Sequence, residues 1–110
     1  MTNQYTPAIQ RFVDAVLTTP GDTSDTLRRT VEARAAQYGG RPGDDGSGEV
    51  PGELTRYVDK VAKHAYKVTD ADIEALRQAG YSEDAIFEIT LSAALGAGLA
   101  RLERGLEALR

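Results

Sequence analysis

The sequence contains no cysteine and no tryptophan, and aromatic residues make up only 6% of its 110 positions. Without cysteine the chain can form no disulfide, no thiolate metal site and no cysteine nucleophile. A core with so few aromatic rings must be built mainly from Leu, Ile, Val and Ala. Only one histidine is present, which also excludes a metal site made of several histidines.

An excess of positive charge is missing as well. The formal net charge is -4 and no predicted helix carries a basic stripe, whereas nucleic-acid phosphates require clustered Lys and Arg. The least polar stretch, residues 85–100, is shorter than a membrane span and includes Glu88. The first twelve residues lack the basic and apolar regions of a secretion signal. We therefore expect a cytoplasmic protein that binds neither nucleic acid nor membranes.

The residues that are present predict an all-α domain, a bundle of about five helices. The content of 41% hydrophobic and 27% charged residues is typical of a globular chain. Thr6 and Pro7 have the residue types of an N-cap and a first helical position, and Pro20-Gly21 ends the apolar stripe that follows. A second helix follows the capping residues 22–24 and stops at Gly39-Gly40. Residues 1–38 are thus predicted to form an N-terminal helical hairpin.

Residues 39–50 hold five glycines and almost no apolar side chain, which predicts a flexible linker. A functional loop is the alternative. Within it, Asp44-Asp45-Gly46 weakly resembles a calcium-binding loop, but the other ligand positions are missing. We therefore predict no metal site and no bound cofactor.

Residues 51–110 are predicted to form a three-helix unit. Pro51 opens its first helix, which ends near Tyr66-Lys67. Thr69 and Asp72 have the spacing of a capping box for the next helix, and Gly80 stops that helix. Ser82 caps a last helix that can run from residue 83 almost to 110, roughly 40 Å at the usual rise per residue.

This last helix is apolar on every side in its first half, so other helices must enclose it. One chain supplies too few helices for that, and we expect a homo-oligomer. Small residues spaced by four, at positions 92, 96 and 100, indicate close helix packing, either between subunits or within one chain. Leucines at spacings of four and three follow, as in a helix–helix seam, which could instead bind a different protein. The predicted interface residues are Leu91, Leu95, Gly96, Leu99, Leu102 and Leu106.

Tyr57, Lys60 and His64 are the candidate catalytic residues. Spacings of three and four place them along one side of a helix, where a phenol, an ammonium and an imidazole could transfer protons. In the alternative interpretation, His64 only stabilises the end of the helix and Tyr57 is an ordinary residue at the edge of the core.

The spacing Tyr57-x-x-Lys60-x-x-x-His64 resembles the Cys-x-x-Cys-x-x-x-His motif of the alkylhydroperoxidase D-like and carboxymuconolactone decarboxylase superfamily. The segment from Val68 to Leu109 also resembles that family, in its "AGYSEDAIFEIT" corner and its long Ala-rich helix. The resemblance covers roughly residues 51–109. It implies an all-helical fold that assembles as trimers or hexamers.

The redox members of that superfamily reduce peroxides with the two cysteines, while the histidine and an upstream glutamate relay protons. Here Tyr57 and Lys60 stand at the cysteine positions, only His64 matches, and residues 45–49 offer no clear match for the glutamate. Thiol peroxidase chemistry is excluded because there is no sulfur to oxidise. We therefore expect a non-redox member that acts as an oligomeric scaffold or interaction protein. The alternative is an acid/base enzyme, decarboxylase- or isomerase-like, that uses His64 on a small anionic substrate.

Overall fold

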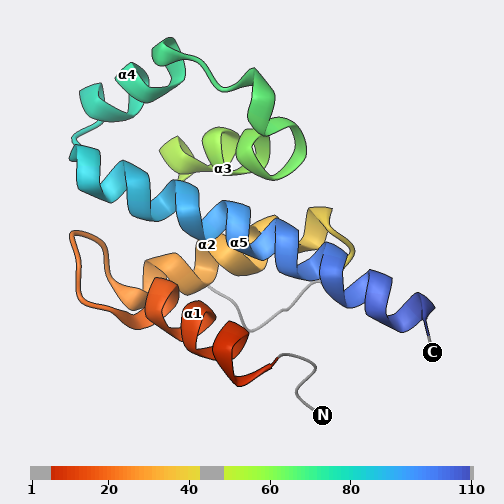
Figure 1. The fold of residues 1–110 in the computed structure, drawn as a ribbon. Helices are drawn as coiled ribbons and strands as arrows, with labels where there is room; N and C mark the ends of the chain where they lie inside the picture. The colour runs from red at the N-terminus through yellow and green to blue at the C-terminus, as the bar shows by residue number, and fades with distance from the viewer. Residues whose placement is uncertain (1–5, 43–48, 110) are drawn as a thin grey trace.

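Five α-helices and one short 3-10 turn make up the computed structural model, which describes residues 6–42 and 49–109 (Figure 1). The helices are α1 (Pro7–Thr18), α2 (Asp25–Tyr38), α3 (Gly52–His64), α4 (Asp70–Gln78) and α5 (Glu83–Ala108), and the 3-10 turn η1 is Ala65–Lys67. The predicted all-α bundle with a long apolar C-terminal helix is confirmed.

Helices α1, α2, α4 and α5 begin where the capping residues predict. The side chains of Thr6, Ser24 and Ser82 each accept a hydrogen bond from the backbone N–H three residues further on. Thr69 and Asp72 form the reciprocal capping box that opens α4. Each of these side chains satisfies a backbone N–H that has no partner inside its own helix.

Glycines in the left-handed region follow the ends of α2 and α4. Gly40 has a φ of 108° and Gly80 a φ of 103°, conformations that side chains with a Cβ rarely adopt. The third helix ends slightly before the predicted position. At His64 the backbone leaves the helical region, with φ -147° and ψ 59°, and the chain continues into η1.

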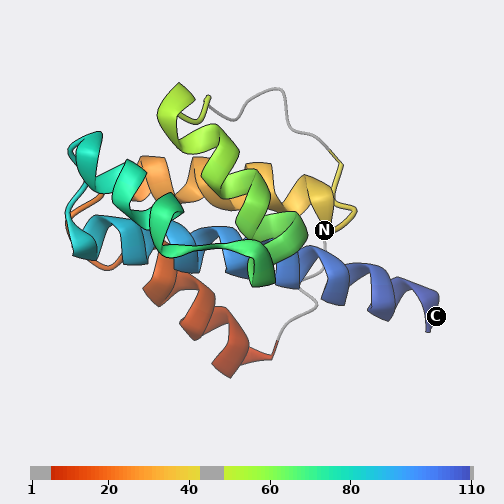
Figure 2. The same cartoon turned by 90° about the horizontal axis from the view of Figure 1, so that it is seen from above.

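Helix α5 lies at the centre of the molecule, and the other helices are arranged around it (Figures 1 and 2). Its longest contact is with α2, and this contact is very close. A Cβ added to Gly96 of α5 would lie 2.9 Å from the carbonyl carbon of Glu32. One added to Gly39, after α2, would lie 2.7 Å from the Cβ of Ala100. Gly96 and Ala100, two of the small residues spaced by four, are therefore packed against other parts of the same chain.

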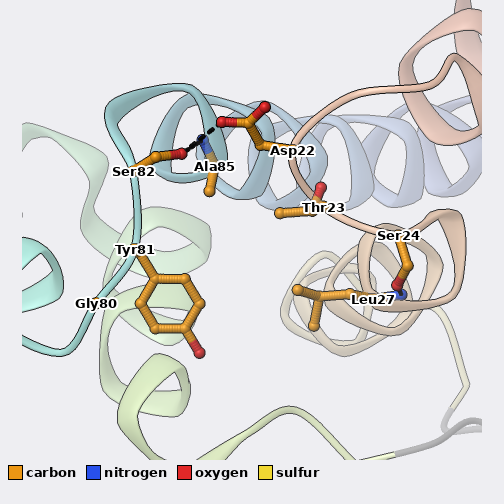
Figure 3. A pocket seen from close by; sticks show the side chains of 8 residues that line it. All are labelled: Asp22, Thr23, Ser24, Leu27, Gly80, Tyr81, Ser82 and Ala85. Carbon is orange, nitrogen blue, oxygen red and sulfur yellow. Dashed lines mark hydrogen bonds between the residues drawn. The ribbon is translucent and has the colours of Figure 1, made fainter.

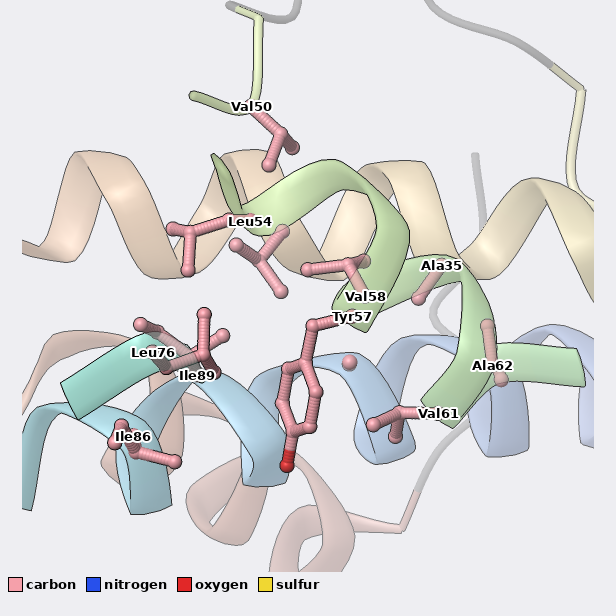
Figure 4. Close-up of a cluster of buried hydrophobic side chains, with 13 residues drawn as sticks. Ala35, Val50, Leu54, Tyr57, Val58, Val61, Ala62, Leu76, Ile86 and Ile89 are labelled. Carbon is pink, nitrogen blue, oxygen red and sulfur yellow. The ribbon is translucent and has the colours of Figure 1, made fainter. Parts of the chain in front are cut away.

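The main hydrophobic cluster joins α2, α3, α4 and α5 (Figure 4). Its largest fully buried apolar side chains are Leu54, Ile89, Val31 and Val58, and burial of each contributes about 2 kcal/mol. In a second, smaller cluster, Val13 and Leu17 of α1 pack against Leu99 of α5. Residues from the predicted hairpin and from the predicted three-helix unit therefore share one core.

Both described ends of the Gly-rich segment are attached to the bundle. The guanidinium of Arg41 bonds the carboxylates of Glu32 on α2 and Glu103 on α5, at 2.8 and 3.1 Å. Val50 is buried in the main cluster. Asp44-Asp45-Gly46 lies outside the described residues.

Candidate functional site

Tyr57 is a buried side chain of the core, with only 6% of its surface exposed (Figure 4). Its hydroxyl lies 2.6 Å from the hydroxyl oxygen of Thr90 on α5. Since the Thr90 hydroxyl donates its proton to the carbonyl oxygen of Ile86, Tyr57 donates to Thr90. The phenol proton is therefore held in a bond that joins α3 to α5.

We expect Tyr57→Phe to lower the free energy of unfolding by about 1 kcal/mol, because Thr90 loses a hydrogen-bond donor while the ring still fills its place. Urea unfolding followed by circular dichroism measures the change. Tyr66→Phe, on an exposed ring, is the control and should change nothing measurable. A Tyr57→Phe variant as stable as the original chain would contradict the assignment of this bond.

Lys60 ties α3 to α4. Its ammonium lies 2.8 Å from a carboxylate oxygen of Asp72, and the same oxygen accepts the backbone N–H of Thr69 at 2.9 Å. Two hydrogen bonds hold the pKa of Asp72 below its usual value. The bond from Lys60 has the largest influence, and the bond from the Thr69 backbone has the next largest. The ammonium is therefore already engaged in a structural ion pair.

His64 lies at the end of α3 and is exposed. Its ring meets the ring of Tyr66 edge to face, with 6.0 Å between the centroids. Tyr57 and Lys60 share a pocket of about 290 Å³ between α3 and α4, and His64 is not among the residues that line it. The structure thus brings two of the three predicted catalytic residues together, and places the third in solvent.

A second pocket, of about 430 Å³, lies where the loop between α1 and α2 meets the corner between α4 and α5 (Figure 3). Its polar side chains are mostly paired. The carboxylate of Asp22 accepts the hydroxyl proton of Ser82 at 2.6 Å, and Ser24 caps α2. Leu27 and Tyr81 supply the apolar walls. A carboxylate beside two helix starts disfavours a bound anion.

No group of three or more His, Cys, Asp or Glu side chains that could hold a metal ion occurs within residues 6–42 and 49–109. Most titratable residues of the two pockets are instead bonded within the chain: Lys60 pairs with Asp72, and Glu53 accepts the hydroxyl proton of Tyr81. We find no arrangement among them that combines an available proton donor with an enclosed cavity.

The outward face of α5 carries a row of uncharged residues. Its residues recur at spacings of four and three, which places them on one side of a helix, and none is charged. We call this set the outward stripe: Phe87, Leu91, Ala94, Gly98, Leu102, Gly105 and Leu109. The exposed fractions of Phe87, Leu102 and Leu109 are 64%, 40% and 84%. The last turns of α5 extend past the other helices (Figures 1 and 2).

The predicted interface residues divide between this face and the interior. Leu102 is exposed, and Leu91, Leu95 and Leu106 are partly buried. Leu99 is buried against Val13 and Leu17. The sixth residue, Gly96, faces the backbone of Glu32 within the same chain.

A comparison of the chain with known protein families, curated proteins and solved structures found no match. The resemblance to the alkylhydroperoxidase D-like superfamily therefore has no support from these comparisons. What stands independently is the all-α bundle and its exposed apolar face.

Sequence reasoning missed the glycines of the outward stripe. A Cβ added to Gly98 or Gly105 would meet nothing within 4 Å, so the bare backbone of α5 is open to solvent there. A glycine inside a helix costs about 1 kcal/mol relative to alanine. The signal that could have found them is the uncharged spacing of four and three from Phe87 to Leu109.

By length and composition alone, α5 also qualifies as a helix that could cross a membrane. Half of its most apolar 18-residue window is buried inside the bundle, and the core helix of a soluble protein passes the same test. The window is therefore weak support for a membrane span.

Proposed function

We propose that this chain is a non-catalytic, oligomeric scaffold or interaction protein that self-associates through the outward stripe of α5. One observation carries the proposal: an apolar face about 33 Å long, given the helical rise, of which Leu91 is partly buried and the other six residues are exposed. Exposed apolar surface that is continuous over such a length is typical of protein contacts. A second copy of the chain would remove it from water.

In its more specific form, the proposal is that this chain is a cysteine-less relative of the alkylhydroperoxidase D-like superfamily and retains its helical scaffold. The order α3, α4, α5 and the tight corner at Gly80 and Tyr81 support it. With no sulfur nucleophile, peroxide reduction by thiols has no chemical basis. Thiol-dependent peroxidase turnover by the purified chain would refute this form of the proposal.

The acid/base alternative has less support. Tyr57 donates its proton to Thr90, Lys60 pairs with Asp72, and His64 lies in solvent outside the pocket that those two residues line. General acid/base catalysis requires a group within reach of the proton it moves. A cytoplasmic location and the absence of nucleic-acid and membrane partners remain parts of the proposal.

The test is the mass in solution, measured by light scattering across protein concentrations. We expect a multiple of the 11.8 kDa chain mass, and Leu102→Glu should shift the mass toward that single-chain value. A charge at this exposed position disrupts an apolar contact but leaves the core of the chain intact. The matched control is Tyr66→Glu, which places the same charge at an exposed aromatic residue away from α5.

A mass of 11.8 kDa at every concentration would overturn the proposal of self-association. In that case, the exposed Leu102 and Leu109 would favour an adaptor that binds a different protein. If Leu102→Glu and Tyr66→Glu lowered the mass equally, the contact would not lie on the outward stripe.

A further inference from the structure

We propose that two copies of the chain pair antiparallel along α5, about a two-fold axis that passes beside Gly98. This inference rests on the proposed self-association and specifies its geometry. The partner is a second copy of the same chain. The contact surface is the outward stripe defined above.

The positions of the stripe are symmetric about Gly98. Four, seven and eleven residues before it are Ala94, Leu91 and Phe87. At the same distances after it are Leu102, Gly105 and Leu109. A two-fold axis perpendicular to the helix places each residue opposite the one at the mirrored position, because a two-fold contact pairs the same surface on both copies.

Two of the three mirrored pairs are complementary in size. Leu91 would face the partner's Gly105, and Ala94 would face the partner's Leu102, so a large side chain meets a small one in both pairs. At each end of the contact, Phe87 would face the partner's Leu109. At the axis, Gly98 would face the partner's Gly98, and the two helices could approach closely because the helix surface at Gly98 is bare. Interdigitation of this kind leaves few voids.

A parallel pair would fit poorly. Each residue would then face its own copy, so that Gly98 and Gly105 would face glycines and leave gaps between the larger side chains. The outline of the molecule favours the antiparallel pair too. The last turns of α5 extend past the bundle (Figure 1), and in an antiparallel pair each such end covers the exposed Phe87 of the partner.

The charges around the stripe favour protein over lipid. Helices that lie on membranes have Lys and Arg beside their apolar face. Here the first turn of α5 carries Glu83 and Asp84, the guanidinium of Arg101 beside the stripe donates to the carbonyl oxygen of Ala62, and the chain has a net charge of -4. A contact made by one helix from each chain is small, so we expect a dissociation constant on the order of micromolar.

Single cysteines test the geometry, because the natural chain has none. We expect Gly98→Cys to form a disulfide-linked dimer under mild oxidation, since only residues at the axis lie next to their own copy. Phe87→Cys should not link to itself, because its copy would lie about 33 Å away, beyond the reach of a disulfide. An equal mixture of Ala94→Cys and Leu102→Cys chains should cross-link far more than either variant alone. Arg29→Cys, on the exposed side of α2, controls for random collision.

A matched pair of charge variants measures the contact without oxidation. Gly98→Glu should weaken self-association at least 100-fold in sedimentation equilibrium, since it places two like charges at the axis. Gly52→Glu is the control, because its Cβ also meets nothing within 4 Å but it lies at the start of α3. Both variants should keep the circular dichroism of the original chain.

Three other outcomes of these experiments would contradict the antiparallel pair. A dimer in which Phe87→Cys links to itself would establish a parallel pair and overturn the antiparallel one. A stable trimer in which Gly98→Glu has no effect would overturn the two-fold contact but leave self-association intact. A single chain that floats with anionic vesicles, or that stays monomeric without binding them, would overturn both the inference and the proposed function.

Discussion

Gly96→Ala is expected to destabilise the chain by about 3 kcal/mol, a large effect for the addition of one methyl group. The added Cβ would fall on the carbonyl oxygen of Glu32 and within 3.1 Å of its Cα. These are backbone atoms of α2, which cannot turn away as the end of a side chain could. The two helices would have to separate along their longest contact, and the buried side chains around them would lose close packing.

Gly98→Ala is the matched control, two residues further along the same helix. Nothing lies within 4 Å of the added methyl group, and alanine forms helix better than glycine, so we expect a gain of about 0.5–1 kcal/mol. Both variants should be unfolded with urea at one low protein concentration, because self-association would add to the apparent stability. Equal effects at the two positions would show that α2 and α5 do not meet as described.

Glu88→Ala is expected to cost about 2 kcal/mol, because one carboxylate holds the loop between α1 and α2 against α5. It accepts the backbone N–H groups of Asp22 and Thr23 at 2.9 and 2.8 Å, and also the Thr23 hydroxyl proton at 2.5 Å. Removal of the carboxylate leaves these donors without a partner, and part of that cost is recovered from water at the exposed edge.

The same carboxylate makes stability depend on pH. Burial alone would raise the pKa of Glu88, but the bonds from Thr23 and from the backbone of Asp22 outweigh it and lower the pKa. A carboxyl group with a lowered pKa in the folded state stabilises it fully above the unfolded pKa, about 4.3 for Glu. That stabilisation is lost as the pH falls through the lower folded value. The advantage of the original chain over Glu88→Gln should therefore shrink below about pH 4.

Urea unfolding between neutral and acidic pH measures this difference. Glu107→Gln, at an exposed position near the end of α5, is the control for the general effect of losing one negative charge. If the advantage of the original chain over Glu88→Gln stayed constant down to the most acidic point, the hydrogen bonds to Asp22 and Thr23 would not favour the charged form.

The helix starts could be predicted because capping is local. Each capping side chain accepts a bond from a backbone N–H three residues away, so the adjacent sequence alone indicates where the helix begins. The four caps are Thr6, Ser24, Thr69 and Ser82. The bonds that join distant segments leave no such signal. Arg41 reaches Glu103 across 62 positions, and nothing in the neighbourhood of either residue indicates the pair.

The faces of α5 show why the sequence could not separate the buried side of this helix from its exposed side. Since the first half of the helix is apolar on every side, its periodicity could not indicate which side meets α2 and which remains open. Gly96 and Gly98 have the same residue type two positions apart, yet one contacts the backbone of α2 and the other is bare. Only the packing of α2 against α5 distinguishes them.

The central place of α5 has a consequence for synthesis on the ribosome. Among the helices described, α5 comes last in chain order, and the main hydrophobic cluster contains its Ile86, Ile89 and Ala93. While the first four helices emerge, they have no central helix to pack on. Each nascent chain must therefore complete its fold late, after α5 has left the exit tunnel, and until then its apolar side chains are open to chaperones.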